Sequence, residues 1–245
     1  MEHTKEAAVL GGTLFLGLVL GGWMLGSQIK AIKLADRYVA VRGLAERNVK
    51  SDLAIWTLTV SASGDDYASV LHQAADGKDK TVAFLTSAGI QQNEIAVASP
   101  DVTDKQAREY GNNDKGPRYL VSQQVVVTSP RVDAVSAANA KTASLLDQGV
   151  MLGRNQVQYK FSSLNSIKPD MISEATKNAR EAAERFAADS GSKVGAIRSA
   201  SQGQFSISAP NEGGAEPNPY GGDNGDSSMM KKVRVVTSTD YYLEK

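Results

Sequence analysis

Few residues of this chain have the chemistry to act as acids, bases or metal ligands. The 245 residues include no cysteine and only two histidines, His3 and His72. The lack of cysteine excludes disulfides, thiolate metal sites and cysteine nucleophiles. His3 precedes an apolar stretch near the N-terminus, so histidine chemistry in the rest of the chain depends on His72 alone.

His72 lies in a predicted helix, with Asp65 and Asp66 ahead of it and Asp76 one turn later. A catalytic histidine needs a nucleophile and an orienting acid within about 3 Å. Asp76 at i+4 could supply the acid, but no G-x-S-x-G elbow presents a serine. The sequence therefore favours a surface histidine. We assign no catalytic residue and predict that the protein is not an enzyme.

A late segment rich in Gly, Pro and Asn carries acids that could bind calcium, namely Glu212, Glu216, Asp223 and Asp226. They lack the dense D-x-D-x-D-G spacing of a calcium loop. We therefore predict no metal site and expect residues 208–228 to form a mobile, solvated loop. The glycines around Gly195 do not form a phosphate-binding G-x-G-x-x-G motif, so no cofactor site is predicted.

The apolar stretch Ala7–Gly26 contains no charged residue. About twenty helical residues span roughly 30 Å, the thickness of the hydrocarbon core of a bilayer. Residues 7–27 are therefore predicted to be a transmembrane anchor, after a short tail at 1–6 and before a linker at 28–37. A cleaved signal peptide is the alternative, but Lys30 and Lys33 interrupt an A-x-A cleavage pattern. A buried core helix would rarely be apolar on every face.

Two pairs of glycines within this stretch have the spacing that brings membrane helices together. Gly17 and Gly21 form one G-x-x-x-G pair, and Gly22 and Gly26 form another. At about 100° per residue the second pair is rotated about 140° from the first. Two small faces suit contacts with two neighbouring helices, as in a ring or bundle. The alternative is that glycine is simply common in membrane helices.

The flanking charges favour one orientation in the membrane. The C-terminal flank carries Lys30, Lys33 and Arg37, whereas the N-terminal flank has Lys5 balanced by acids. Positive residues favour the cytoplasmic side, so the flanks alone place the soluble part inside the cell. The whole chain has a formal net charge of zero, which gives no electrostatic footprint for nucleic acid.

The elements that follow the anchor alternate between strands and helices. Period-two patterns predict strands at 38–43, 53–61, 94–99, 119–128, 157–164, 193–201 and 232–242. Helical spacing predicts helices at 65–87, 130–147 and from Pro169 to Gly191, and residues 101–118 read as a long hairpin loop. Gly77 weakens the prediction that the first helix is unbroken. This order indicates an α+β fold of mainly antiparallel sheets with three packed helices.

The third helix gives the clearest pattern. Its predicted apolar face consists of Ile172, Ala175, Ala179, Ala182, Ala183 and Phe186. Pro169 and Asp170 suit a first turn, and Gly191 suits a stop.

Three motifs resemble those of the bacterial SIMPL-domain family, over about Tyr38 to the C-terminus. The first follows the family's A-[KR]-x-x-A-E-x-[FL]-A and G-x-x-[VL]-G-x-[IV] patterns, with Ala179, Arg180, Ala183, Glu184, Phe186, Ala187, Gly191, Val194, Gly195 and Ile197. The second resembles the start of the family's domain, with Val41, Gly43, Ala45, Val49, Asp52 and Ala54. The third, LTSAGIQQNEI, has Glu94 where the family more often has Asp. These residues are of the packing and turn types, so the resemblance is specific for fold.

The resemblance implies an envelope protein without a defining enzymatic activity. Family members are usually exported, some form ring-shaped or channel-like homo-oligomers, and members are linked to oxidative-stress defence. We therefore expect a single-pass protein of the bacterial inner membrane, in contact with lipid, with a periplasmic domain at 38–245 that assembles with copies of itself. The flanking charges argue for the opposite orientation. A second hypothesis is an adaptor that captures a segment of an envelope protein on an exposed strand edge.

Overall fold

The computed structural model describes residues 17, 19, 37–107, 116–210 and 224–244. The described chain divides into two units. Unit 1 holds residues 37–45, 169–205 and 235–244, and unit 2 holds residues 46–168 and 206–234 as far as they are described. Within the described part of the chain, no helix has the length and apolarity needed to cross a membrane.

Unit 2 is built on a five-stranded antiparallel sheet. Its strands are β2 (Leu53–Gly64), β3 (Ile95–Val97), β4 (Asp101–Asp104), β5 (Tyr119–Ser129) and β6 (Met151–Lys160). The order is β3–β5–β2–β6. Strand β4 also pairs with β5, along Tyr119–Ser122, whereas β3 pairs with Val125–Val127. Side chains along β2 alternate between buried and half-buried, as expected for a strand covered on one face.

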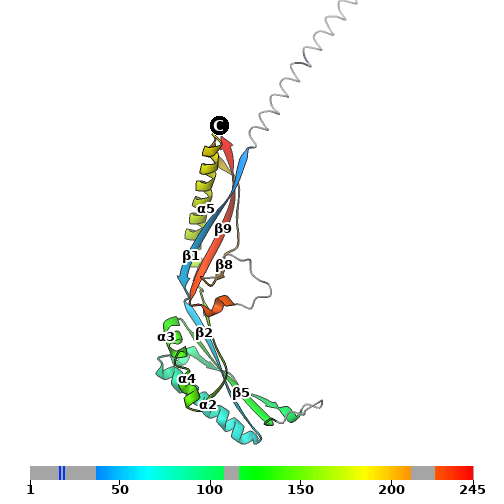
Figure 1. Ribbon diagram of the computed structural model, residues 1–245, viewed down its shortest axis with the longest axis vertical. Coiled ribbons are helices and arrows are strands. Elements are labelled where there is room, and N and C mark those ends of the chain that lie inside the picture. Colours follow the sequence, from blue (N-terminus) through cyan, green and yellow to red (C-terminus); the bar gives the residue numbers. More distant parts are fainter. Residues whose placement is uncertain (1–16, 18, 20–36, 108–115, 211–223, 245) are drawn as a thin grey trace, which may run out of the picture. The chain divides into compact units, whose positions relative to one another are not determined.

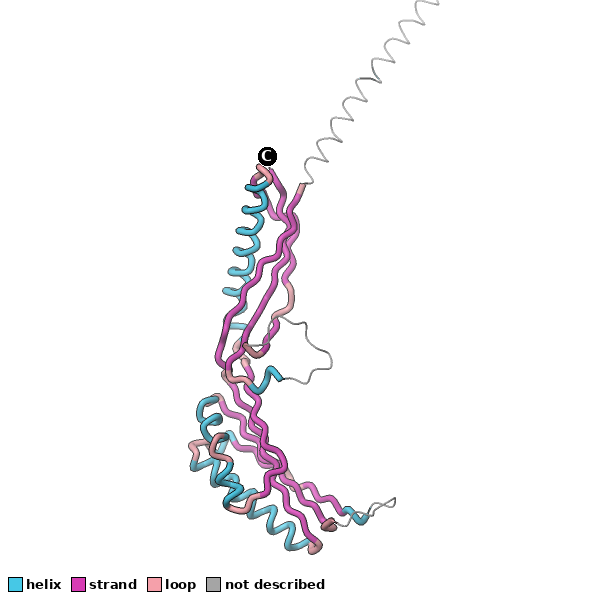
Figure 2. The backbone as a smooth tube through the Cα atoms, in the orientation of Figure 1, coloured by secondary structure: helices cyan, strands magenta, loops and turns pink. Residues whose placement is uncertain are grey.

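Three helices of unit 2 pack beside this sheet (Figures 1 and 2). They are α2 (Tyr67–Ser87), α3 (Val132–Asn139) and α4 (Ala143–Asp147). The core of the unit centres on Trp56 and Leu58 of β2, with Leu85 of α2 and Val135 of α3. Asp66 caps α2 by accepting a 2.8 Å hydrogen bond from the Ser69 N–H.

The second sheet has the order β1–β9–β7, and the short strand β8 also pairs with β9. Its strands are β1 (Tyr38–Lys50), β7 (Lys193–Gln202), β8 (Ser206–Ser208) and β9 (Met230–Glu244). In unit 1, helix α5 (Leu164–Asp189) lies along β1 and β9 (Figures 1 and 2). The residues that α5 buries recur every four positions: Met171, Ala175, Ala179, Ala183 and Ala187.

The small side chains of α5 allow an unusually close approach to β1. A Cβ atom added at Gly43 would overlap the carbonyl oxygen of Ala175 and would lie 2.8 Å from the Cβ of Ala179. Gly77 has the same role in unit 2, where an added Cβ would lie 2.8 Å from Cγ1 of Val60. The glycine that weakened the helix prediction therefore sits at a packing contact, and α2 is unbroken.

The α+β class and the antiparallel sheets are confirmed, with several corrections to individual elements. The predicted helix 130–147 is two helices, α3 and α4. The predicted loop 101–118 begins with β4 and a 3-10 turn at Lys105–Ala107. Strand β6 spans Met151–Lys160 rather than 157–164, and β8 lies in the segment that joins β7 to the predicted loop.

Helix α5 also departs from its prediction. It begins at Leu164, so Pro169 lies inside the helix and not in its first turn. Phe186 is 62% exposed, because the buried stripe recurs every four residues and leaves position 186 about 100° away from Ala187. Gly89 and Gly191 have positive φ angles just beyond α2 and α5, and Gly191 is confirmed as the predicted stop of α5.

Candidate functional site

The acids near His72 are each engaged elsewhere. His72 is exposed on α2. Asp65 accepts a 3.0 Å hydrogen bond from the Arg118 N–H, and Asp76 pairs with Lys80 at 2.8 Å. Asp66 caps α2, as described above. All three carboxylates therefore make contacts within the fold of unit 2.

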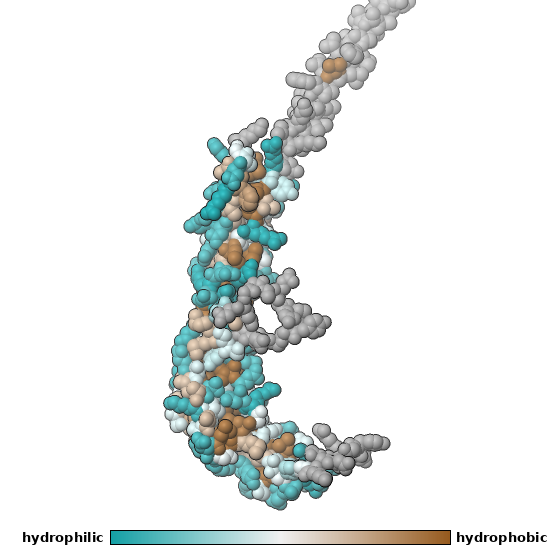
Figure 3. All heavy atoms as spheres, in the orientation of Figure 1, coloured by the Kyte–Doolittle hydropathy of each residue, from teal (hydrophilic) through white to brown (hydrophobic). Residues whose placement is uncertain are grey.

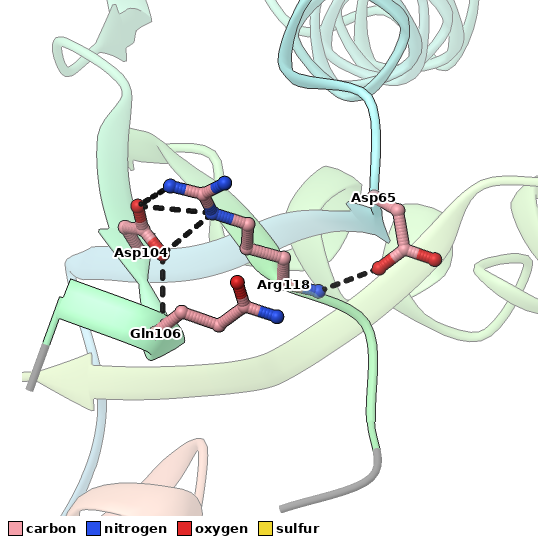
Figure 4. A network of polar contacts seen from close by, with 4 residues as sticks. All are labelled: Asp65, Asp104, Gln106 and Arg118. Atoms are coloured by element: carbon pink, nitrogen blue, oxygen red, sulfur yellow. Dashed lines mark hydrogen bonds and ion pairs between the residues drawn. The ribbon is translucent and has the colours of Figure 1, made fainter. Parts of the chain in front are cut away.

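A polar cluster closes the base of the segment between β4 and β5 (Figure 4). The Arg118 guanidinium donates to both carboxylate oxygens of Asp104, at 2.9–3.2 Å. The Gln106 N–H donates to the same carboxylate at 2.9 Å. The Arg118 hydrogen bonds hold the pKa of Asp104 below its ordinary value, and Asp104 in turn raises the pKa of Arg118. This fork-like pair positions the strand ends on either side of residues 105–118.

Glu94, at the position where the family more often has Asp, links three segments of unit 2. Its carboxylate accepts from the Gln91 N–H at 2.9 Å and from the Ser129 hydroxyl at 2.9 Å, and it pairs with Arg131. Burial acts to raise the pKa of Glu94, but the hydrogen bonds from Arg131, Gln91 and Ser129 outweigh it and lower the pKa. Glu94 therefore holds the turn before β3 in place.

Asp52, another motif residue, organises the turn that leads into α5. Its carboxylate accepts from the Ser162 N–H at 2.7 Å, the Ser162 hydroxyl at 3.0 Å and the Ser163 N–H at 2.9 Å. Burial acts to raise the pKa of Asp52, but these hydrogen bonds outweigh it, so the pKa lies below its ordinary value. The motif aspartate therefore holds this turn in place.

The late acidic segment is described only in part. Glu212, Glu216 and Asp223 lie outside the described residues. Asp226 lies 3.8 Å from Nζ of Lys231, whose side chain is 2% exposed. A carboxylate that neighbours an ammonium group is a poorer ligand for calcium. Across the described ranges, no group of three or more His, Cys, Asp or Glu is arranged to hold a metal ion.

Unit 2 also has an open cavity of about 270 Å³ beside α2. Its polar wall includes Ser61, Ser63, Gln73, Asp76 and Lys80. Lys80 is already paired with Asp76 and donates to the Gln148 carbonyl at 3.3 Å. The volume lies just below the usual range for ligand pockets, roughly 300–1,000 Å³. The charged groups of its wall satisfy one another, so the cavity brings together no reactive pair.

The most distinctive surface of unit 1 is one edge of its sheet, along β1. Two hydrogen bonds fix how β1 pairs with β9: Leu243 N–H donates to Arg37 O, and Ser51 N–H donates to Met229 O, both at 2.9 Å. The start of β1 therefore meets the end of β9, so the strands are antiparallel. In such a pair, alternate residues exchange hydrogen bonds, here the odd-numbered residues of β1. The N–H and C=O groups of its even-numbered residues point away from β9.

Helix α5 covers this edge at one point. The side-chain amide of Asn178 donates a 2.8 Å hydrogen bond to the carbonyl of Leu44, an even-numbered residue. The remaining outward-pointing groups of unit 1 are those of Tyr38, Ala40 and Arg42, and in the described chain β1 pairs with no strand except β9. The sequence motifs did not single out Asn178, because its role depends on where α5 lies against β1.

The predicted self-association glycines fall almost entirely outside the described residues. Gly17 is helical and exposed, whereas Gly21, Gly22 and Gly26 are among the residues that the structure does not describe. The anchor at 7–27 therefore stays a prediction from sequence.

Several of the motif residues lie in structural contacts, whereas Phe186 and Ile197 are exposed. Ala179, Ala183 and Ala187 are buried, Arg180 pairs with Glu184 at 3.0 Å, and Asp52 and Gly43 hold turns and packing in place.

Comparison with protein-family models agrees with the family resemblance that the motifs indicated. A search of curated proteins finds no match. Residues 39–239 match the SIMPL family, which is described as "Protein of unknown function (DUF541)". The match covers both units and all the motif residues discussed above, and so the chain belongs to the SIMPL family.

Proposed function

We propose that this protein is a membrane-anchored structural component of the cell envelope whose copies assemble into a ring. The observation that carries the proposal is the open edge of β1 in unit 1. Unpaired N–H and C=O groups on an edge strand are a template for pairing with another chain, and soluble proteins usually protect them. From Tyr38 to Leu44 the only charged side chain on this edge is Arg42.

The same sheet offers a second edge at β7. Its first half is interrupted by register shifts between Val194 and Ile197 and between Ile197 and Ser199. From Ser199 to Gln202 it pairs regularly with β9. Pairing of β1 in one copy with β7 in the next is a head-to-tail contact, and such contacts close into rings when the rotation permits. Because the register shifts distort the first half of β7, we expect β1 of the next copy to pair with Ser199–Gln202.

A proline at an outward-facing position tests this assembly directly. Ala40→Pro removes an N–H group that points away from β9, so the β1–β9 hydrogen bonds remain. Ala40→Ser is the matched control, because it keeps the N–H. In mild detergent, we expect Ala40→Pro to reduce the oligomer to smaller species while Ala40→Ser leaves its mass unchanged. A folded Ala40→Pro variant with the mass of the unaltered assembly would refute pairing along β1.

The membrane part of the proposal rests on sequence and has its own tests. Replacing Gly17 and Gly21 by Leu is expected to reduce oligomer size if that glycine face joins helices. A reporter that is active only in the periplasm, fused after Lys245, should be active. A silent reporter on a well-expressed fusion would place the soluble part in the cytoplasm, as the charges around the anchor suggest. A role in stress defence, implied by the resemblance, stays a prediction.

The alternative is an adaptor that captures an extended segment of another envelope protein. It is favoured by the shortness of the open edge, since Asn178 covers the carbonyl of Leu44 and leaves room for a short strand. Under this alternative the chain alone is a monomer in detergent and recovers one stoichiometric partner in a pull-down. A defined homo-oligomer without that partner would exclude it.

A further inference from the structure

One end of unit 1 carries three large hydrophobic side chains that stay about half exposed or more. At this end β1 begins, β9 and α5 end, and β7 begins opposite Glu244 of β9 (Figure 1). Phe186 is 62% exposed, Ile197 is 52% exposed and Tyr38 is 48% exposed. Hydrophobic residues are visible on the face of this end that Figure 3 presents.

These side chains lie close to the end itself. Phe186 is three residues from the last residue of α5, a rise of about 4.5 Å. Ile197 pairs with Tyr241, three residues before Glu244, or about 10 Å along the strand. Tyr38 is the first residue of β1. All three therefore lie within about 10 Å of the end, comparable to the depth at which apolar side chains enter a membrane interface.

Each of these residues also has an arginine as its immediate neighbour in sequence: Arg37 with Tyr38, Arg185 with Phe186, and Arg198 with Ile197. The Arg198 guanidinium lies 4.1 Å from the centre of the Tyr38 ring. Guanidinium groups bind phosphate oxygens in a fork, while the adjoining apolar side chain can enter the acyl region. Arginines and exposed hydrophobic side chains at one end of the unit are the residue types that suit a phospholipid surface.

The chain that precedes Tyr38 brings this end to a membrane. Only nine residues, 28–36, separate the predicted anchor at 7–27 from Arg37, so the reach is roughly 35 Å at most. We propose that the end of unit 1 marked by Tyr38, Phe186 and Ile197 rests on the phospholipid surface and that Phe186 and Ile197 insert into it. This contact rests on the membrane anchor of the proposed function and adds a second, protein-domain attachment to lipid.

The natural lack of cysteine allows a clean test with single labels. The full chain is reconstituted in vesicles of phosphatidylglycerol and phosphatidylcholine, with an environment-sensitive fluorophore on Phe186→Cys or Ile197→Cys. Lys177→Cys is the matched control, because its side chain is 77% exposed on the same helix about 13.5 Å farther from the end. We expect lipids with a nitroxide high on the acyl chain to quench labels at 186 and 197, with little loss at 177.

A second test removes the two apolar side chains and carries the label at a neighbouring position. In the Phe186→Ser/Ile197→Ser chain, a label on Asp189→Cys should lose the lipid quenching that it shows when Phe186 and Ile197 are present. Both changes are at exposed positions, so the fold should be retained.

The possible negative results contradict different proposals. A chain that does not float with vesicles contradicts the anchor, and this contact with it. A chain that floats but whose labels at 186 and 197 are not quenched by lipid contradicts the contact alone. Labels shielded from aqueous iodide but unaffected by lipid quenchers would show that a second copy covers this end, which also overturns the proposal.

Discussion

The close contact between Gly43 and α5 gives the sharpest prediction for the fold of unit 1. The substitution Gly43→Ala adds one Cβ atom on the face of β1 that packs against the helix. That atom would overlap the Ala175 carbonyl oxygen and would lie 2.6 Å from the backbone nitrogen of Ala179. The nearest atoms belong to the backbone of a helix and cannot rotate away.

The magnitude follows from the shift that the helix needs. Carbon atoms pack at about 3.5–4.0 Å, so the 2.8 Å contact with Ala179 Cβ alone requires α5 to move by about 1 Å, and the overlap with the Ala175 carbonyl oxygen requires a larger shift. Overpacking of this kind costs up to about 3 kcal/mol. Replacing glycine in a strand returns about 0.5–1 kcal/mol through backbone entropy. We therefore expect Gly43→Ala to lower the free energy of unfolding by about 2 kcal/mol, or the Tm by about 4–8 °C.

The assay is urea or thermal unfolding followed by circular dichroism, with Ala40→Val as the control on the opposite face of the same strand. Ala40 is exposed, so its substitution should change the free energy of unfolding by less than about 0.5 kcal/mol. The double variant Gly43→Ala/Ala179→Gly should stay destabilised, because the overlap with the Ala175 carbonyl remains. An unaltered Tm in Gly43→Ala, or full rescue by Ala179→Gly, would refute the close approach of α5 to β1.

Three further predictions concern the carboxylates of unit 2. Asp52 has a lowered pKa in the folded state, so its contribution is present above its ordinary pKa and is lost as pH falls through the folded value. Asp52→Asn should therefore be less stable near pH 7 and lose less stability on acidification, as measured by urea midpoints against pH. Glu94→Gln should cost about 1–3 kcal/mol in chemical denaturation, because Arg131 loses its charged partner. Arg118→Gln should raise the pKa of Asp104 toward its ordinary value in an NMR titration, and an unchanged pKa would contradict the paired geometry.

Local periodicity was sufficient to predict the elements that carry the core. Alternation along β2 and the four-residue spacing of alanines in α5 are read from neighbouring residues. Strand β2 lies where the sequence placed it, and α5 covers its predicted range but begins five residues earlier, at Leu164. The resemblance to the family includes Asp52 and Gly43 in its motif, but the roles of these two residues depend on distant partners. Asp52 binds a turn 110 residues away, which no local pattern indicates.

The wrong predictions concern elements whose limits depend on nonlocal contacts or on side chains that hydrogen-bond to the backbone. Strand β6 begins with a stretch of weak alternation and is held by its pairing with β2, with a register shift at Thr59/Val60. The helix predicted at 130–147 divides near Asn139, whose carbonyl accepts from the Thr142 hydroxyl. The pattern placed Phe186 on the apolar face because it is apolar, whereas the buried stripe recurs every four residues and leaves Phe186 exposed.

The open edge of β1 could not be predicted from local sequence. Asn178 and Leu44 are separated by 134 residues, and their hydrogen bond defines how much of the β1 edge remains open. Strand order, and hence which strand is an edge, is a property of the whole sheet. The sequence indicated a possible partner edge in general terms, but the choice of β1 required the pairing with β9.

The mass of the intact chain in mild detergent shows whether its copies assemble. A ring should give a monodisperse species at a defined multiple of the 26.0 kDa chain, measured by light scattering with the detergent contribution removed. A monodisperse species at the mass of one chain, with the membrane segment intact and the protein folded, would contradict assembly.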